Sequence, residues 1–110
     1  DPAGSERLEQ VLGRLSDEGR TLVISTHDMD FALRWATRVV VLVAGKIIAD
    51  GLPQAVLSDD AVLRSAQLRR PMLMDVWRTL CDRGLVCADA PCPASVQALA
   101  RLLDDAAPDM

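Results

Sequence analysis

The chain has 110 residues, half of them hydrophobic, and carries 12 basic against 16 acidic side chains, a formal net charge of −4. An acidic balance creates no field that would draw it to phosphate backbones or anionic lipid, so nucleic-acid binding is disfavoured. Its longest apolar runs, around Val39 to Ala44, are far shorter than the roughly 20 residues that span a bilayer. We therefore expect one small domain plus a tail, with any membrane contact made through a partner.

The first predicted element is a helix from Asp1-Pro2 to about Glu18. An Asp side chain can cap free N–H groups, Pro suits the first helical position, and Gly19 suits a left-handed stop. Because the chain opens on Asp and directly at a helix start, we expect it to be a fragment of a longer protein. The helical spacing creates one apolar stripe, consisting of Leu8, Val11, Leu12 and Leu15.

A strand–helix–strand unit is predicted next. The run Thr21 to Ser25 is typical of a strand buried in a parallel sheet, and the stripe of the first helix is expected to pack on that sheet. Asp28 offers a second helix cap, and the helix to Ala36 leads into a strand over Val39 to Val43. This pattern predicts a βαβ unit of an α/β fold.

The turn at Ala44-Gly45 predicts an antiparallel edge strand over Lys46 to Asp50, which ends at Gly51. Beyond Pro53 the pattern becomes helical, over 55–57, 61–68, 72–81 and 95–103, with a linker over 88–94. We expect three parts: an α/β part over 1–51, a helical cap over 52–87, and a linker with a C-terminal helix over 88–110.

Cysteine spacing gives little support for a metal site. Cys81, Cys87 and Cys92 follow a C-x5-C-x4-C pattern, which matches neither the C-x2-C zinc spacing nor an even disulfide framework. We expect free thiols and no bound metal.

His27 is the main candidate functional residue. It follows a predicted buried strand and precedes a capped helix, where open α/β sheets place ligand contacts. An anionic oxygen such as a phosphate could be held by the helix start while the imidazole donates a hydrogen bond. A histidine that only caps or packs at a strand end would occupy the same position, so spacing alone leaves both interpretations open.

Several segments in register resemble the ABC ATPases. The run Leu22 to Asp28 resembles their switch-histidine segment, and Asp1-Pro2 resembles the end of their D-loop. The later hairpin pattern is also similar: Val41-Leu42-x-x-Gly45-x-Ile47, followed by Asp50-Gly51. The tail over 51–68 resembles that of cobalt-type energy-coupling-factor ATPases, although any amphipathic helix pair could show similar spacing.

The resemblance implies the C-terminal part of a P-loop NTPase domain from an ABC transporter ATP-binding subunit, and the tail resemblance suggests import of cobalt or nickel. It implies that His27 contacts the γ-phosphate of ATP and that Asp1 lies at the dimer interface near the nucleotide, whereas Asp28 is expected to be a cap. The intact subunit would use ATP and Mg²⁺, pair with a second ATPase subunit, and bind transmembrane subunits at the cytoplasmic side of the membrane.

The sequence contains no G-x-x-x-x-G-K-[ST] phosphate loop, no ABC signature and no apolar strand ending in Asp-Glu. We therefore expect that these residues alone neither bind ATP usefully nor hydrolyse it, and that the isolated chain is marginally stable or self-associates. Two alternatives stay open. One is a non-catalytic helical interaction module over 72–103 with Met74 and Trp77 on an exposed face; the other is an ABC-type ATPase of chromosome maintenance or repair.

Overall fold

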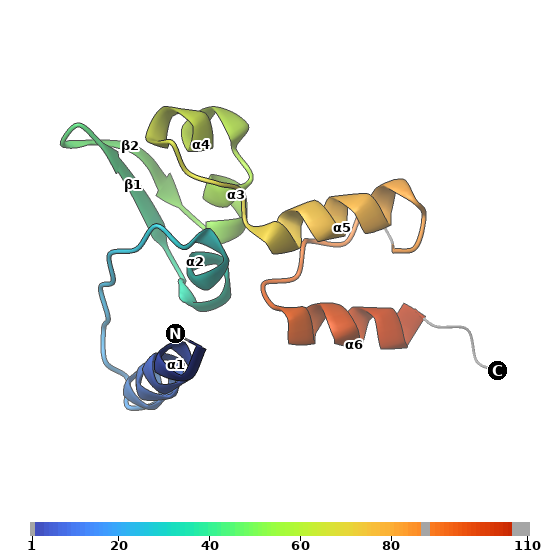
Figure 1. Ribbon diagram of the computed structural model, residues 1–110, viewed down its shortest axis with the longest axis horizontal. Coiled ribbons are helices and arrows are strands. Elements are labelled where there is room, and N and C mark those ends of the chain that lie inside the picture. Colours follow the sequence, from blue (N-terminus) through green and yellow to red (C-terminus); the bar gives the residue numbers. More distant parts are fainter. Residues whose placement is uncertain (1, 87–88, 107–110) are drawn as a thin grey trace.

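The computed structural model of the protein describes residues 2–86 and 89–106. In chain order the elements are α1 (Pro2–Asp17), α2 (Met29–Trp35), β1 (Val39–Val43), β2 (Lys46–Gly51), α3 (Pro53–Leu57), α4 (Asp60–Ala66), α5 (Met72–Asp82) and α6 (Val96–Ala106) (Figure 1). The radius of gyration is 15.6 Å, against about 13 Å for a compact domain of this length. The chain is spread out, because α1 lies below the hairpin while α5 and α6 extend away to the right (Figure 1).

The β1–β2 hairpin forms as predicted. The strands pair antiparallel, with Val39 opposite Gly51. Their turn places Ala44 at φ 50° and Gly45 at φ 77°. A two-residue hairpin turn of this kind needs positive φ at both positions, which glycine adopts without strain. Local sequence therefore determines this element.

An ion pair spans the open end of the hairpin. Arg38 donates from Nε to Asp50 Oδ1 at 2.7 Å and from Nη2 to Asp50 Oδ2 at 2.6 Å. This hydrogen bonding lowers the pKa of the Asp50 carboxyl below its usual value. The pair favours the observed hairpin register. It adds little to stability, because both side chains are exposed to solvent.

The predicted strand over Thr21 to Ser25 is wrong for this structure. Residues 21–26 lie outside any helix or strand, and the sheet within the described residues contains only β1 and β2. A segment becomes a strand only when its backbone groups bond to a neighbouring strand, and none lies beside this one. Val23 is accordingly 95% exposed. Of the predicted βαβ unit, only α2 and β1 form in the described residues. The α/β class is therefore confirmed only as a combination of helices with a two-stranded hairpin.

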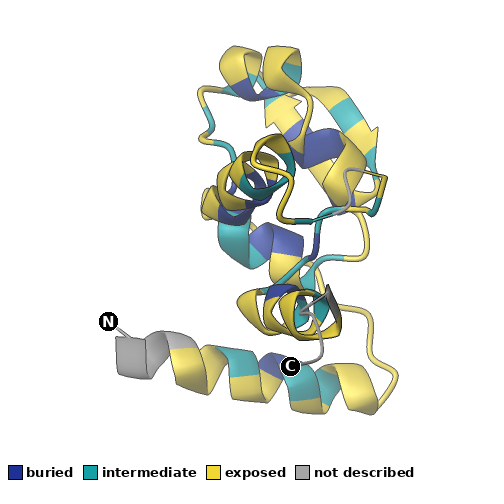
Figure 2. Cartoon of the chain, turned by 90° about the vertical axis from the view of Figure 1, so that its right-hand side faces the viewer, coloured by how far each residue is buried: buried dark blue, intermediate teal, exposed yellow. Residues whose placement is uncertain are grey.

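Helix α1 forms and ends as predicted, with Gly19 at φ 76°. Its apolar stripe, however, does not pack on a sheet. Leu12 is buried, whereas Leu8 and Val11 are 50% and 46% exposed, and the helix presents a largely exposed surface (Figure 2). The expected packing partner is missing because residues 21–26 form no sheet.

The core lies between α2 and the helices that follow the hairpin. It is one cluster of buried side chains: Met29, Ala32, Leu33, Leu57, Leu63, Leu73, Met74, Trp77 and Leu99. Since Met74 and Trp77 are each only 7% exposed, their proposed role as exposed anchors of an interaction module is contradicted. Apolar burial favours placing them in the core.

Candidate nucleotide-contact site

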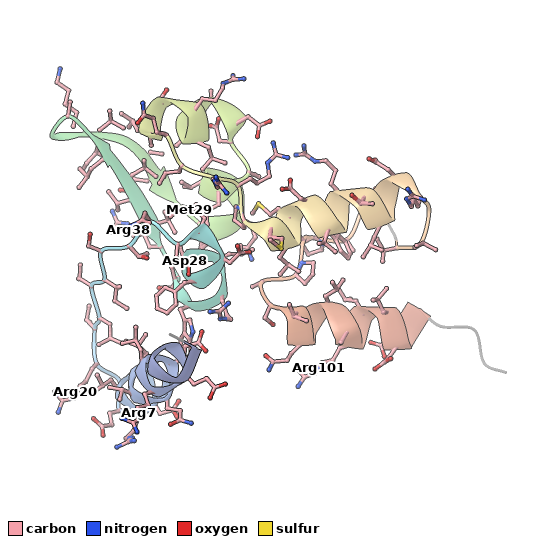
Figure 3. The ribbon with its side chains drawn as sticks, viewed as in Figure 1. Arg7, Arg20, Asp28, Met29, Arg38 and Arg101 are labelled. Atoms are coloured by element: carbon pink, nitrogen blue, oxygen red, sulfur yellow. The ribbon has the colours of Figure 1, made fainter. Side chains whose placement is uncertain are left out.

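His27 lies on a bend between the extended residues 21–26 and the start of α2, and its side chain is exposed. Both neighbours are held in place. The backbone N–H of Asp28 donates to Thr26 Oγ1 at 3.0 Å, and Asp28 Oδ1 accepts from the N–H of Phe31 at 3.1 Å. The predicted cap at Asp28 is therefore confirmed, and Figure 3 shows it at the start of α2. The bend presents one imidazole to solvent on a fixed backbone.

A shallow hollow of about 200 Å³ lies beside this bend. Its lining comes from α1, from the residues before His27 and from α2: Leu8, Glu9, Ile24, Ser25, Thr26, Asp28, Phe31 and Arg34. His27 itself does not line it. The hydroxyls of Ser25 and Thr26 and the Arg34 guanidinium give the hollow polar groups, while Leu8, Ile24 and Phe31 make part of its wall apolar.

A partly exposed contact between α1 and α2 joins two residues that line the hollow, Glu9 and Arg34, and sequence reasoning missed it. Glu9 Oε1 accepts hydrogen bonds from Arg34 Nε at 2.8 Å, from Arg34 Nη2 and from Trp35 Nε1 at 3.2 Å. The Arg34 bonds, followed by the Trp35 bond, lower the pKa of Glu9 below its ordinary 4.5. Helix α1 comes close here, since a Cβ on Gly13 would lie 3.5 Å from the Trp35 ring. No spacing rule joins residues 25 positions apart.

The other predicted residues fall elsewhere. Asp1 and Cys87 lie outside the described residues. Cys81 and Cys92 are free thiols packed against the core cluster; burial first, and Cys81 second, raises the pKa of the Cys92 thiol. Within 2–86 and 89–106, no three His, Cys, Asp or Glu side chains gather to hold a metal ion, and no helix there is long and apolar enough to cross a membrane.

The chemistry available at the bend is limited. A single exposed imidazole can donate one hydrogen bond to an anionic oxygen or accept one proton. An exposed histidine followed by a capped helix and an antiparallel hairpin keeps the order of elements that the resemblance to the ABC ATPases implied. Within the described residues, the bend therefore offers a single side-chain group that could contact an anionic oxygen such as a phosphate.

Comparison with known proteins supports the resemblance to the ABC ATPases. No family model matches the chain. It is 41% identical over 85 residues to the energy-coupling factor transporter ATP-binding protein EcfA2 of Methanospirillum hungatei, covering 77% of the chain and 21% of that protein. It is 42% identical over 77 residues to the EcfA protein of Carboxydothermus hydrogenoformans, covering 70% of the chain and 28% of that protein.

A third relative matches nearly the whole chain. It is a putative ABC transporter ATP-binding protein of Methanothermobacter marburgensis, 33% identical over 105 residues, covering 96% of the chain and 38% of that protein. The chain thus spans about a fifth to two fifths of the length of these curated relatives. It is a homologue of the ATP-binding subunits of ABC and energy-coupling factor transporters, which confirms the resemblance seen in the sequence.

Proposed function

We propose that the chain carries the switch-histidine segment of an ABC transporter ATP-binding subunit, in which His27 donates a hydrogen bond to the γ-phosphate of ATP. One observation carries this proposal: the imidazole is exposed on a bend whose flanking residues, Thr26 and Asp28, are both fixed by hydrogen bonds. A histidine that packed against the core would instead be buried. Homology to subunits named as ATP-binding supports the same conclusion.

In this proposal His27 senses a nucleotide that other residues hold. A hydrogen bond to a charged group contributes about 1.5 to 3 kcal/mol, whereas millimolar affinity needs about 4 kcal/mol. The 110 residues contain no phosphate loop, so ATP and Mg²⁺ would be bound mainly by residues outside this chain. When bound, Mg²⁺ would neutralise charge on the phosphates.

The finer parts of the proposal follow the family resemblance of the sequence. Asp1 would lie at the interface with a second ATPase subunit, and the assembled pair would bind transmembrane subunits at the cytoplasmic side of the membrane. ATP hydrolysis would drive import, and the similarity of residues 51–68 to cobalt-type subunits favours a cobalt or nickel ion as the cargo. The helical-module alternative is weaker because Met74 and Trp77 are buried.

The test is His27→Ala in the full-length ATP-binding subunit that contains these residues. Loss of a charge-assisted hydrogen bond made at the reacting phosphate should lower ATP turnover about ten- to a hundredfold. Nucleotide binding should change much less. The control is Arg101→Ala, on the exposed surface of α6 and far from Asp28 in Figure 3. Unchanged turnover in His27→Ala would remove His27 from the site.

A further inference from the structure

We propose that Asp30 is a positioning residue that ties the helical tail to the helix following His27, by capping α5 from outside. For its effect on turnover this inference rests on the proposed function; its structural part does not. Asp30 lies in the first turn of α2, three residues after His27. The backbone N–H of Leu73, at the start of α5, donates to Asp30 Oδ1 at 3.3 Å.

Helix α5 has no cap of its own. Its N-cap residue is Pro71, and no side chain of that residue accepts a hydrogen bond from the helix. The first N–H groups of a helix have no partner within the helix and need an outside acceptor, especially where the start is buried. Pro71 is almost fully buried and Leu73 is 7% exposed. A carboxylate from a residue 43 positions earlier therefore satisfies a donor that water reaches poorly.

The same two helices share the core. Met29 and Leu33 of α2 belong to the buried cluster that also contains Leu73 and Trp77 of α5. In Figure 3, Met29 lies at the start of α2, beside Asp28. The apolar contact and the Asp30 hydrogen bond thus fix the beginning of α2 against the beginning of α5.

Hydrogen bonds of Arg70 hold α5 to α4. Arg70 donates from Nη2 to Asp60 at 2.6 Å and from Nη1 to Asp75 at 3.0 Å. Asp60 begins α4 and Asp75 lies in the first turn of α5. Together with the Asp30 hydrogen bond, these contacts tie the start of α5 to two neighbouring helices, α2 and α4. A shift of α5 is therefore transmitted to the first turn of α2, and from there through Asp28 to the bend that presents His27.

The experiment compares Asp30→Ala, Asp30→Asn and Asp82→Ala in the full-length ATP-binding subunit. Hydrogen–deuterium exchange of the amides at Leu73 and over 26–31 is measured together with ATP turnover. Loss of a side-chain cap corresponds to about fivefold more frequent opening. We expect Asp30→Ala to speed exchange about fivefold at Leu73 and measurably over 26–31. It should lower kcat several-fold without changing KM.

The variants separate positioning from general damage. Asp30→Asn keeps an oxygen that can accept the Leu73 N–H, so it should restore most of the protection and of kcat. Asp82→Ala removes an exposed carboxylate at the far end of α5 and should resemble the unmodified protein. Unchanged exchange at Leu73 in Asp30→Ala would overturn the cap. Faster exchange at Leu73 alone, with 26–31 and kcat unchanged, would overturn the link to His27.

Failure of this inference can be told from failure of the proposed function. If His27→Ala leaves turnover unchanged, the proposed γ-phosphate contact of His27 is refuted. The exchange over 26–31 in Asp30→Ala would still show whether the tail positions the bend.

Discussion

Removing the carboxylate of Asp28 should loosen the bend that presents His27. Asp28 Oδ1 accepts the Phe31 N–H at 3.1 Å, and its own N–H donates to Thr26. Helix α2 has only seven residues, far fewer than the roughly 12 to 15 that hold a helix unaided. Loss of an N-cap costs about 0.5 to 2 kcal/mol, so the first turn of α2 in Asp28→Ala should open about fivefold more often.

The assay is amide exchange over 29–32 together with ATP turnover of the full-length subunit. Asp28→Asn should behave almost normally, because Asn caps helices as well as Asp does. The matched control is Asp59→Ala, which removes the cap of α4, where Asp59 accepts from two N–H groups. It should cost similar stability and leave turnover unchanged. If Asp28→Asn abolishes turnover as Ala does, the negative charge itself acts on the ligand and the capping explanation is refuted.

Three further predictions follow from the packing and the perturbed pKa values. Leu33 is 2% exposed in the core, so Leu33→Ala should lower the free energy of unfolding by about 2 to 5 kcal/mol. Urea unfolding with no such loss would contradict the core assignment. Because the pKa of Glu9 is lowered in the folded protein, the contribution of its contact with Arg34 to stability is complete above pH 4.5. That contribution is lost as the pH falls through the pKa that Glu9 has in the folded protein. The melting temperature measured at decreasing pH should show this loss, and Glu9→Gln should remove the acid loss that Glu9 causes. An identical acid profile in the variant would count against the contact. Cys92, whose pKa burial raises, should react with iodoacetamide at neutral pH more slowly in the folded chain than in urea, and equal rates by mass spectrometry would show that the thiol is exposed.

Local signals in the sequence predicted the elements whose conformation depends on neighbouring residues. The turn at Ala44-Gly45, the stop at Gly19 and the cap at Asp28 are each determined by the φ preference or hydrogen-bonding group of one or two residues. The hairpin, the end of α1 and the start of α2 follow from them. The cap at Asp28 also places His27 directly before a helix, which is the part of the candidate site that was predicted; the strand expected before His27 does not form.

Long-range contacts could not be predicted in the same way. The strand over 21–25 failed because strand formation depends on a partner rather than on the apolar run itself. The Asp30–Leu73 bond joins residues 43 positions apart, and the Glu9–Arg34 pair joins residues 25 positions apart. No periodicity or motif links such positions. Burial of Trp77 likewise depends on how α5 packs against α2.

The most direct test of the central claim is the NMR signal of the His27 imidazole in the full-length subunit, assigned by its loss in His27→Asn. A ring that contacts the γ-phosphate should distinguish nucleotides that carry that group from those that lack it. We predict a shift of the His27 ring resonances on binding a non-hydrolysable ATP analogue with Mg²⁺, and little or no shift with ADP and Mg²⁺. Identical spectra with the two nucleotides, both at saturation, would contradict the assignment of His27 as the γ-phosphate contact.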